Sequence, residues 1–345
     1  MQTALAKGAS DIHVVEGSPV QLRINGELEP LADSAVQNAQ QTQELIYSVL
    51  KPEQQERLAR ERDVDFSLAI AGVGRFRGNA YVQRQSYAMD LRVITEKIPS
   101  IDELRLPRIC HTLATLRQGF VLVTGPTGHG KSTTIAAIIE EINQLRAVNV
   151  VTIEDPIEYL YANKKSIFSQ REMGSDTLSW NVGLRSVLRQ DPDVVLIGEM
   201  RDIETMMAAL TIAETGHLVF STLHTNSASQ TVDRIVDSFS GPQQAQVRLQ
   251  LSNVIEAVIS QRLVPSKSGS RVPATEIMVA TPAVRNTIRE AKTPQLDNII
   301  QTSSELGMLT LEASLAYWVG QGVIDVDKAR EFSLRPAELN RLLSK

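Results

Sequence analysis

The sequence has a single cysteine, no long hydrophobic run and no excess of positive charge. Cys110 alone cannot form an internal disulfide or a cysteine-ligated zinc cluster, which excludes a disulfide-stabilised secreted scaffold and fits a reducing compartment. Apolar runs such as Phe120–Val123 are too short to span a bilayer, and Met1–Ser10 lacks the apolar segment of a signal peptide. We therefore expect a cytoplasmic protein with no direct membrane insertion.

The charge balance is acidic. Lys and Arg number 35 against 40 Asp and Glu, which gives a net charge of −5. No basic stripe for backbone phosphates is expected, so nucleic acid is not an expected partner. With 345 residues, 42% of them hydrophobic, the chain is long enough for two domains that each bury a core.

The pattern of hydrophobic residues differs between the first part of the chain and the rest. The first part mixes short alternating strands with amphipathic helices, and Asn25-Gly26 is a strong signal for a tight hairpin turn. Pro99 and Pro107 indicate a linker. Beyond it, short continuous apolar runs alternate with amphipathic stretches, which predicts a parallel sheet covered by helices. The expected parts are a domain at 1–95, a linker at 96–112, a core at 113–280 and a helical tail at 281–345.

A phosphate-binding loop is the strongest signal in the sequence. Residues 125–132 read GPTGHGKS, which satisfies G-x-x-x-x-G-K-[ST] between a buried strand and a helix. Glycines let the backbone curl around phosphate oxygens, Lys131 places a charge on the β- and γ-phosphates, and the Ser132 hydroxyl is a ligand for Mg²⁺. We therefore expect ATP and Mg²⁺ as cofactors. The predicted nucleotide-binding residues are Gly125, Pro126, Thr127, Gly128, His129, Gly130, Lys131, Ser132 and Thr133.

Two acidic clusters follow buried strands of the predicted sheet, at the edge where such sheets bind ligands. The first lies in Thr152–Glu158, where Pro156 forbids a helix. The second is Glu199, which ends a segment shaped like a Walker B strand, with Gly198 where many ATPases have an aspartate. We expect a general base from the first cluster and the Mg²⁺ side of the site from Glu199. The residues alone do not decide which of Glu154, Asp155 and Glu158 is the general base.

Histidines and arginines complete the candidate site. His224 follows a third buried strand and is interpreted as a polar switch that senses the γ-phosphate, whereas His217 is more simply a satisfied core histidine. His129, at the loop tip, more simply faces solvent than phosphate. Residues 75–84 alternate strictly, so Arg77 lies on a polar strand face that either neutralises transition-state charge or is merely solvated.

Together these motifs resemble the secretion-type AAA+/RecA-like ATPases, and most closely the PilT family of type IV pilus retraction motors. The likeness covers essentially the whole chain. Residues 8–13 look like the family's N-terminal signature, 125–134 its Walker A, 152–158 its aspartate box, 197–202 its Walker B, 223–228 its histidine box and 283–292 its retraction-associated AIREGK-type motif.

The resemblance implies an α/β protein with a PAS-like α+β N-terminal domain, then a RecA-like P-loop ATPase domain with a C-terminal helical tail. It implies a homo-hexameric ATPase at the cytoplasmic face of the inner membrane that drives pilus retraction and twitching motility. Its partners would be the inner-membrane pilus platform protein and, as a further candidate, a second retraction ATPase. Carried over by position, the catalytic residues are Glu158, Glu199, Arg77, Arg92 and His224, the metal residues are Ser132 and Glu199, and Arg84 ranks below the other arginines.

Two departures from the family pattern bear on function. His129 replaces the family's usual serine, and Ala291 replaces a glycine of the tail motif in a segment expected to be helical. On that helix Val284 and Ile288 share one face, next to the face that carries Arg285. We expect this face to dock on a neighbouring subunit or on the platform protein and to couple hydrolysis to work. The alternative is a tail helix that merely packs on the ring, with Arg285 and Arg289 solvated.

Other functions are kept as alternatives. An accessory retraction ATPase would share the same core. A pilus assembly or type II secretion ATPase typically has a tetracysteine zinc insert and a long N-terminal region, and one cysteine and a phosphate loop at residue 125 argue against both. A non-hydrolysing nucleotide-dependent scaffold would not need Lys131, Glu158 and Glu199 together. A nucleic-acid translocase would share the RecA-like core but needs a basic stripe.

Overall fold

The computed structural model describes residues 1–24, 26–32, 34–70, 72–94 and 97–344. Asn25 of the expected turn and the expected domain boundary at 95–96 lie outside the described residues. The chain forms two compact units: Met1–Lys97 with Glu158–Leu160, and Ile98–Ile157 with Tyr161–Lys345. Among the described residues, no helix combines the length and the apolar character that a membrane crossing requires.

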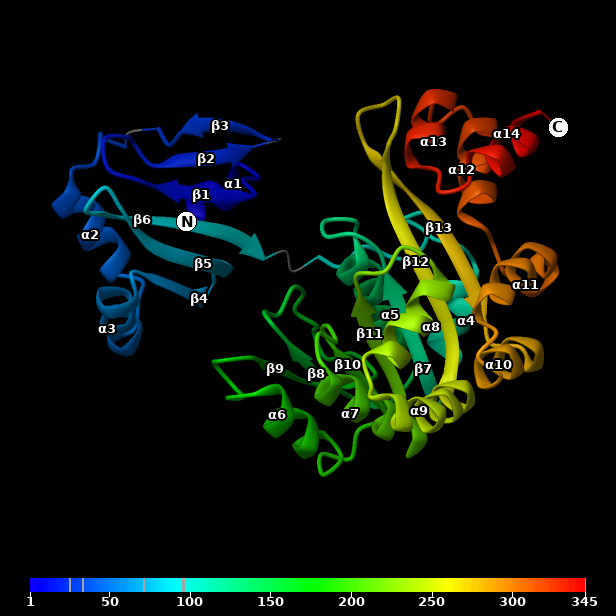
Figure 1. Ribbon diagram of the computed structural model, residues 1–345. Coiled ribbons are helices and arrows are strands. Elements are labelled where there is room, and N and C mark those ends of the chain that lie inside the picture. The colour runs from blue at the N-terminus through cyan, green and yellow to red at the C-terminus, as the bar shows by residue number, and fades with distance from the viewer. Residues whose placement is uncertain (25, 33, 71, 95–96, 345) are drawn as a thin grey trace. The chain divides into compact units, whose positions relative to one another are not determined.

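The first unit is an antiparallel sheet with helices packed on it (Figure 1). Its elements are α1 (Gln2–Ala6), β1 (Asp11–Val14), β2 (Gln21–Ile24), β3 (Glu27–Pro30), α2 (Ala39–Tyr47), α3 (Pro52–Glu61), β4 (Asp63–Ile70), β5 (Gly74–Gln83) and β6 (Ser86–Ile94). The strand order is β3-β2-β1-β6-β5-β4, and every neighbouring pair is antiparallel. Phe76, Gly78 and Ala80 of β5 are buried while Arg77 is exposed, so the alternation expected for this strand is confirmed.

The second unit is built on a seven-stranded sheet of order β13-β12-β7-β11-β10-β8-β9. Its strands are β7 (Gly119–Thr124), β8 (Asn149–Glu154), β9 (Ile167–Glu172), β10 (Val194–Ile197), β11 (Leu218–Leu223), β12 (Ile255–Pro265) and β13 (Arg271–Val279). All neighbouring pairs are parallel except β12 and β13. Every residue of β7, β10 and β11 is buried, as expected for strands covered on both faces.

Helices before the tail cover this sheet (Figure 1). They are α4 (Ile109–Thr115), α5 (Lys131–Leu145), α6 (Trp180–Val187), α7 (Ile203–Glu214), α8 (Ala228–Asp237) and α9 (Gly241–Val254). Several begin at a residue whose side chain accepts a hydrogen bond from a free backbone N–H of the first turn. Asp202 accepts a hydrogen bond from the Thr205 N–H at 2.8 Å, and Ser227 accepts one from the Gln230 N–H at 3.2 Å.

The tail consists of short helices, drawn orange to red in Figure 1. They are α10 (Pro282–Arg289), η1 (Thr293–Gln295), α11 (Leu296–Thr302), η2 (Ser304–Leu306), α12 (Leu311–Gly320), α13 (Val326–Phe332) and α14 (Pro336–Leu343). The last three form a small core of their own with β12 and β13, in which Leu315 packs near Val272. Trp318 fixes α12 to β13 by donating to the Pro273 carbonyl at 2.7 Å.

The docking role expected for one face of α10 is wrong. Val284 and Ile288 are fully buried and belong to the main core of the second unit. Arg285 donates to the Asn253 carbonyl at the end of α9 at 2.8 Å and pairs with Glu256 at 2.7 Å. Ala291 is not helical either, because it follows the end of α10 with a φ of 58°. The face of this helix that carries Val284 and Ile288 is therefore part of the core, whereas Ala283, Asn286 and Arg289 are exposed.

Candidate functional site

The loop from Gly125 to Gly130 joins β7 to α5 and lies directly against β12. A Cβ atom at Gly125, whose φ is +139°, would come within 2.2 Å of the Gln261 carbonyl oxygen. A Cβ atom at Gly130, whose φ is +79°, would come within 2.9 Å of the Gln261 Nε2 atom. Glycine is therefore required at both positions, for its backbone conformation and for the close approach to β12.

Lys131 is the first residue of α5, and its side chain is folded back under the loop. Its Nζ donates to the carbonyl oxygens of Gly125 at 2.8 Å and Pro126 at 3.0 Å. Burial lowers the pKa of this ammonium group, and the charge of Glu199 acts in the opposite direction. The loop thus holds a cation at the N-terminus of a helix, a place that favours anions.

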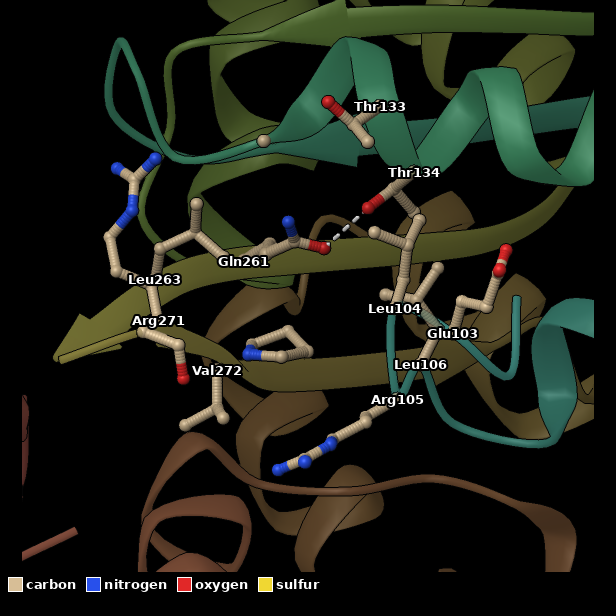
Figure 2. A pocket seen from close by; sticks show the side chains of 13 residues that line it. Glu103, Leu104, Arg105, Leu106, Thr133, Thr134, Gln261, Leu263, Arg271 and Val272 are labelled. Carbon is tan, nitrogen blue, oxygen red and sulfur yellow. Dashed lines mark hydrogen bonds between the residues drawn. The ribbon is translucent and has the colours of Figure 1, made fainter. Parts of the chain in front are cut away.

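A cavity of about 490 Å³ adjoins the loop at the start of α5. Figure 2 shows Thr133 and Thr134 of α5 on one side, Gln261 and Leu263 of β12 beneath them, and the segment around Leu104 across the cavity. Thr134 donates to the Gln261 Oε1 atom at 2.7 Å, which fixes the polar side of the wall. The lining residues are Glu103, Leu104, Arg105, Leu106, Gly130, Thr133, Thr134, Gln261, Leu263, Ser270, Arg271, Val272 and Pro273.

Glu199 and His224 meet at the carboxyl end of the sheet. The His224 Nε2 atom lies 3.3 Å from a Glu199 carboxylate oxygen, and its Nδ1 atom lies 3.5 Å from the hydroxyl of Thr127 in the loop. One imidazole therefore bridges the phosphate loop and the Walker B strand. Arg201 forms an ion pair with Glu199, a contact that sequence reasoning did not find.

The three acids of the segment Thr152–Glu158 have different surroundings. Glu154 is buried and accepts a hydrogen bond from the Thr152 hydroxyl at 2.6 Å. Asp155 and Glu158 are exposed. Glu158 belongs to the first compact unit, whereas Glu154 and Asp155 belong to the second. An exposed carboxylate is available to a water molecule or a ligand, which Glu154 is not.

His129 is half-buried and bonded to the protein rather than turned to solvent. Its Nδ1 atom accepts the Leu263 N–H at 2.9 Å, and its carbonyl oxygen accepts from Gln261 Nε2 at 2.8 Å. His217 is the structural histidine that the sequence suggests, with Nδ1 3.0 Å from the Ile212 carbonyl oxygen. Gln261 and Leu263 were missed because the strand that carries them was not predicted.

The candidate arginines lie on the sheet of the first unit. Arg77 and Arg92 are directly opposite each other on β5 and β6. Both are exposed, and Arg92 also donates to the Asp11 carboxylate at 2.9 Å. Arg84 stands apart from this pair, in the turn between the strands, with a φ of 45°. The structure therefore brings together the two arginines that the sequence analysis ranked first.

Comparisons with known proteins agree with these observations. The family described as "Type II/IV secretion system protein" matches residues 1–297. The type IV pilus retraction ATPase PilT of Pseudomonas aeruginosa is 44% identical over 325 residues, which are 94% of this chain and 94% of that protein. A twitching motility protein of Neisseria gonorrhoeae is 45% identical over 310 residues, or 90% of this chain and 83% of that protein.

A solved structure covers nearly the whole fold. The crystal structure of the pilus retraction motor PilT with bound ADP superimposes with a TM-score of 0.92 at 46% identity, over 98% of this chain and 97% of that one. The expected fold class is confirmed: an α/β chain with an N-terminal β-sheet domain, a RecA-like ATPase domain and a helical C-terminal tail.

Proposed function

Because this chain belongs to the family of type II/IV secretion system proteins, we propose that it is an ATP-hydrolysing motor that retracts type IV pili and so drives twitching motility. The observation that carries the proposal is the full-length likeness to retraction ATPases, in a chain whose phosphate loop, Glu199 and His224 converge at one sheet edge. The motor would work in the cytoplasm at the face of the inner membrane.

The phosphate loop and the adjoining cavity would bind ATP. The loop's backbone N–H groups and Lys131 would hold the β- and γ-phosphates at the start of α5. A cavity of about 490 Å³ that combines leucine side chains with Thr133 and Gln261 is large enough for a base and ribose. The ADP bound in the similar PilT crystal structure supports this assignment.

The residues that would hold Mg²⁺ fit that ion. The Ser132 hydroxyl is exposed on the first turn of α5, and Glu199 supplies carboxylate oxygens at the end of β10. Hydroxyl and carboxylate oxygens are ligands that Mg²⁺ prefers, and Glu199 would act through water. When bound, Mg²⁺ neutralises charge that develops on the phosphates.

The remaining residues would transfer the proton, sense the γ-phosphate and stabilise the charge of the transition state. Glu158 would orient the attacking water and accept its proton, as its exposed carboxylate allows. His224, which contacts Thr127 and Glu199, would report the presence of the γ-phosphate to the Walker B strand. Arg77 and Arg92 would add positive charge in the transition state.

We expect Lys131→Ala and Glu158→Gln to fail in different ways. Lys131→Ala removes a charge that holds phosphate in the ground state, so it weakens both binding and hydrolysis. Glu158→Gln keeps the shape but cannot accept a proton, so ATP binds while turnover falls by about 10²- to 10⁴-fold. Phosphate release and nucleotide titrations measure both, with Lys328→Ala and Glu331→Gln of α13 as controls. Normal hydrolysis by Lys131→Ala would refute the assignment of the phosphate loop as the site of hydrolysis.

We further propose that the active form is a homo-hexamer that engages the pilus platform protein, with a second retraction ATPase as a further candidate partner. The turnover per subunit should then rise with protein concentration until rings form, as read by mass photometry beside the ATPase assay. Arg77→Ala should lower kcat more than nucleotide affinity, because it acts on transition-state charge. Arg60→Ala, an exposed change on α3, is the matched control. A dilute monomer as active as the ring would contradict this assembly.

A further inference from the structure

The tip of the phosphate loop is fastened to β12 by a short network around His129. The His129 imidazole accepts a hydrogen bond from the Leu263 N–H at 2.9 Å. The backbone carbonyl of His129 accepts one from Gln261 Nε2 at 2.8 Å. Gln261 in turn accepts from the Thr134 hydroxyl on α5 at 2.7 Å. His129 thus connects the loop to β12, and Gln261 connects β12 to α5.

The hydrogen bond to Leu263 defines the state of the imidazole. A backbone N–H can only donate, so Nδ1 must carry a lone pair and the ring hydrogen must sit on Nε2. A second proton would occupy Nδ1 and remove the acceptor. The anchor to Leu263 therefore exists in the neutral form of His129 and is lost in the imidazolium form.

The surroundings of His129 favour that neutral form. Burial lowers the pKa of the imidazole, and the positive charges of Arg262 on β12, Arg271 on β13 and Lys131 on α5 lower it further. Arg271 also donates to the Gly128 carbonyl oxygen at 3.4 Å, so it faces the same stretch of loop. The groups facing the ring from all three elements are cations, and each opposes a further positive charge there.

We propose that His129 is a positioning residue of the phosphate loop, whose neutral imidazole holds the loop on β12 in the shape that receives nucleotide phosphates. This inference rests on the proposed ATPase function and assigns to His129 a role through Leu263 rather than through a phosphate contact. Because the pKa of His129 is lowered from its ordinary value of 6.5, the anchor is complete above that pH and is lost only as the pH falls through the lowered pKa.

A pair of substitutions separates the hydrogen bond from the rest of the side chain. His129→Asn places its Oδ1 atom where Nδ1 stood relative to Cγ, so it keeps an acceptor that does not titrate. His129→Ala removes the acceptor. We expect His129→Ala to weaken ADP binding about 2- to 10-fold at pH 8, the range that one net hydrogen bond supplies, and His129→Asn to restore it. Binding is measured in EDTA, and His217→Asn is the control for a histidine at the far end of β11.

Two measurements test whether the neutral imidazole acts through the Leu263 N–H: the pH dependence of ADP binding and the exchange of the Leu263 amide hydrogen. As the pH falls from 8 through the lowered pKa of His129, the wild-type protein should lose affinity relative to His129→Asn, approaching the same 2- to 10-fold. The peptide containing Leu263 should exchange faster in His129→Ala than in either other protein. Unchanged binding and exchange in His129→Ala would overturn the proposal, as would wild-type affinity that rises at low pH, which would indicate an imidazolium–phosphate contact.

The exchange experiment uses the nucleotide-free protein, so it tests the anchor even if ADP binding is absent. A wild-type protein that bound no nucleotide would refute the proposed function, while protection of Leu263 that depends on the residue at position 129 would still support the anchor. Thermal melting of all variants distinguishes a loosened loop from a general loss of the fold.

Discussion

Glu276 is a buried carboxyl group whose ionisation affects the stability of the second unit. It lies on β13 with 3% of its surface exposed, and its side chain accepts the Ala228 N–H at 2.8 Å. Burial raises its pKa to about 7, although the Ala228 N–H and the charge of Arg335 act in the opposite direction. Near neutral pH this group therefore exchanges a proton inside the core.

We expect the free energy of unfolding to depend on Glu276 between pH 5 and 8. Because its folded pKa of about 7 lies above the ordinary 4.5, its contribution is fully present below pH 4.5 and is lost as the pH rises through 7. The loss approaches about 3 kcal/mol at pH 8. Denaturant unfolding of Glu276→Gln should lack this decline, and the exposed Glu305→Gln should keep it. The same pH slope in Glu276→Gln and wild type would contradict the assignment.

At the residue scale, the sequence predicts side chains that follow a recognisable pattern. Lys131 belongs to a loop motif, and Glu199 and His224 each follow a buried strand, so their convergence could be foreseen. Arg201 and Gln261 could not, because nothing in their local sequence marks them. Gln261 contacts the loop across 132 positions of chain, through a register of β12 on β7 that local patterns do not contain.

At the element scale, β7 and β10 could be predicted because each holds an unbroken run of four apolar residues, and β11 because Leu218–Phe220 opens it, with Ser221 and Thr222 only near its end. The strand β12 was missed because Ser260 and Gln261 interrupt its apolar pattern. Both are buried, and both bond to polar groups of the neighbouring β7 and α5: Ser260 lies 2.7 Å from the Thr124 hydroxyl. The polar residues that connect β12 to its neighbours also break the apolar pattern by which a buried strand is predicted.

The end of α10 explains why the family pattern has a glycine where this chain has Ala291. The Lys292 N–H bonds to the Thr287 carbonyl and the Ala291 N–H to the Ile288 carbonyl, which is a Schellman end with Ala291 in the left-handed conformation. For an L-residue with a Cβ atom, that conformation costs about 1–2 kcal/mol. The expectation that Ala291 lies in a helical segment is wrong.

We therefore expect Ala291→Gly to stabilise the protein by about 0.5–1 kcal/mol, after the larger chain entropy of glycine in the unfolded state is subtracted. The matched control is Ala283→Gly in the first turn of α10, an exposed helical position, which should destabilise by about the same amount. Denaturant unfolding measures both. If both substitutions changed stability in the same direction, the left-handed assignment of Ala291 would be contradicted.

At the scale of the whole molecule, the tail is tied to the site by polar contacts. Arg262 of β12 donates to Asn226, within the histidine box, and to the Phe332 carbonyl at the end of α13, each at 3.3 Å. On the other side of the same loop, Ser229 of α8 donates to Asp297 of α11 at 3.1 Å. These contacts connect the segment after His224 to α11 and α13. A displacement of that segment would therefore change hydrogen bonds that hold the tail.

Deletion of the gene for this chain from a piliated host tests the proposed retraction function in cells. If the protein is a retraction motor, the deletion strain should carry more surface pili by electron microscopy and should not twitch. Wild type and Lys328→Ala should restore motility, whereas Lys131→Ala should not. Cells without pili would contradict the account, because they would mean that the motor assembles pili rather than retracting them.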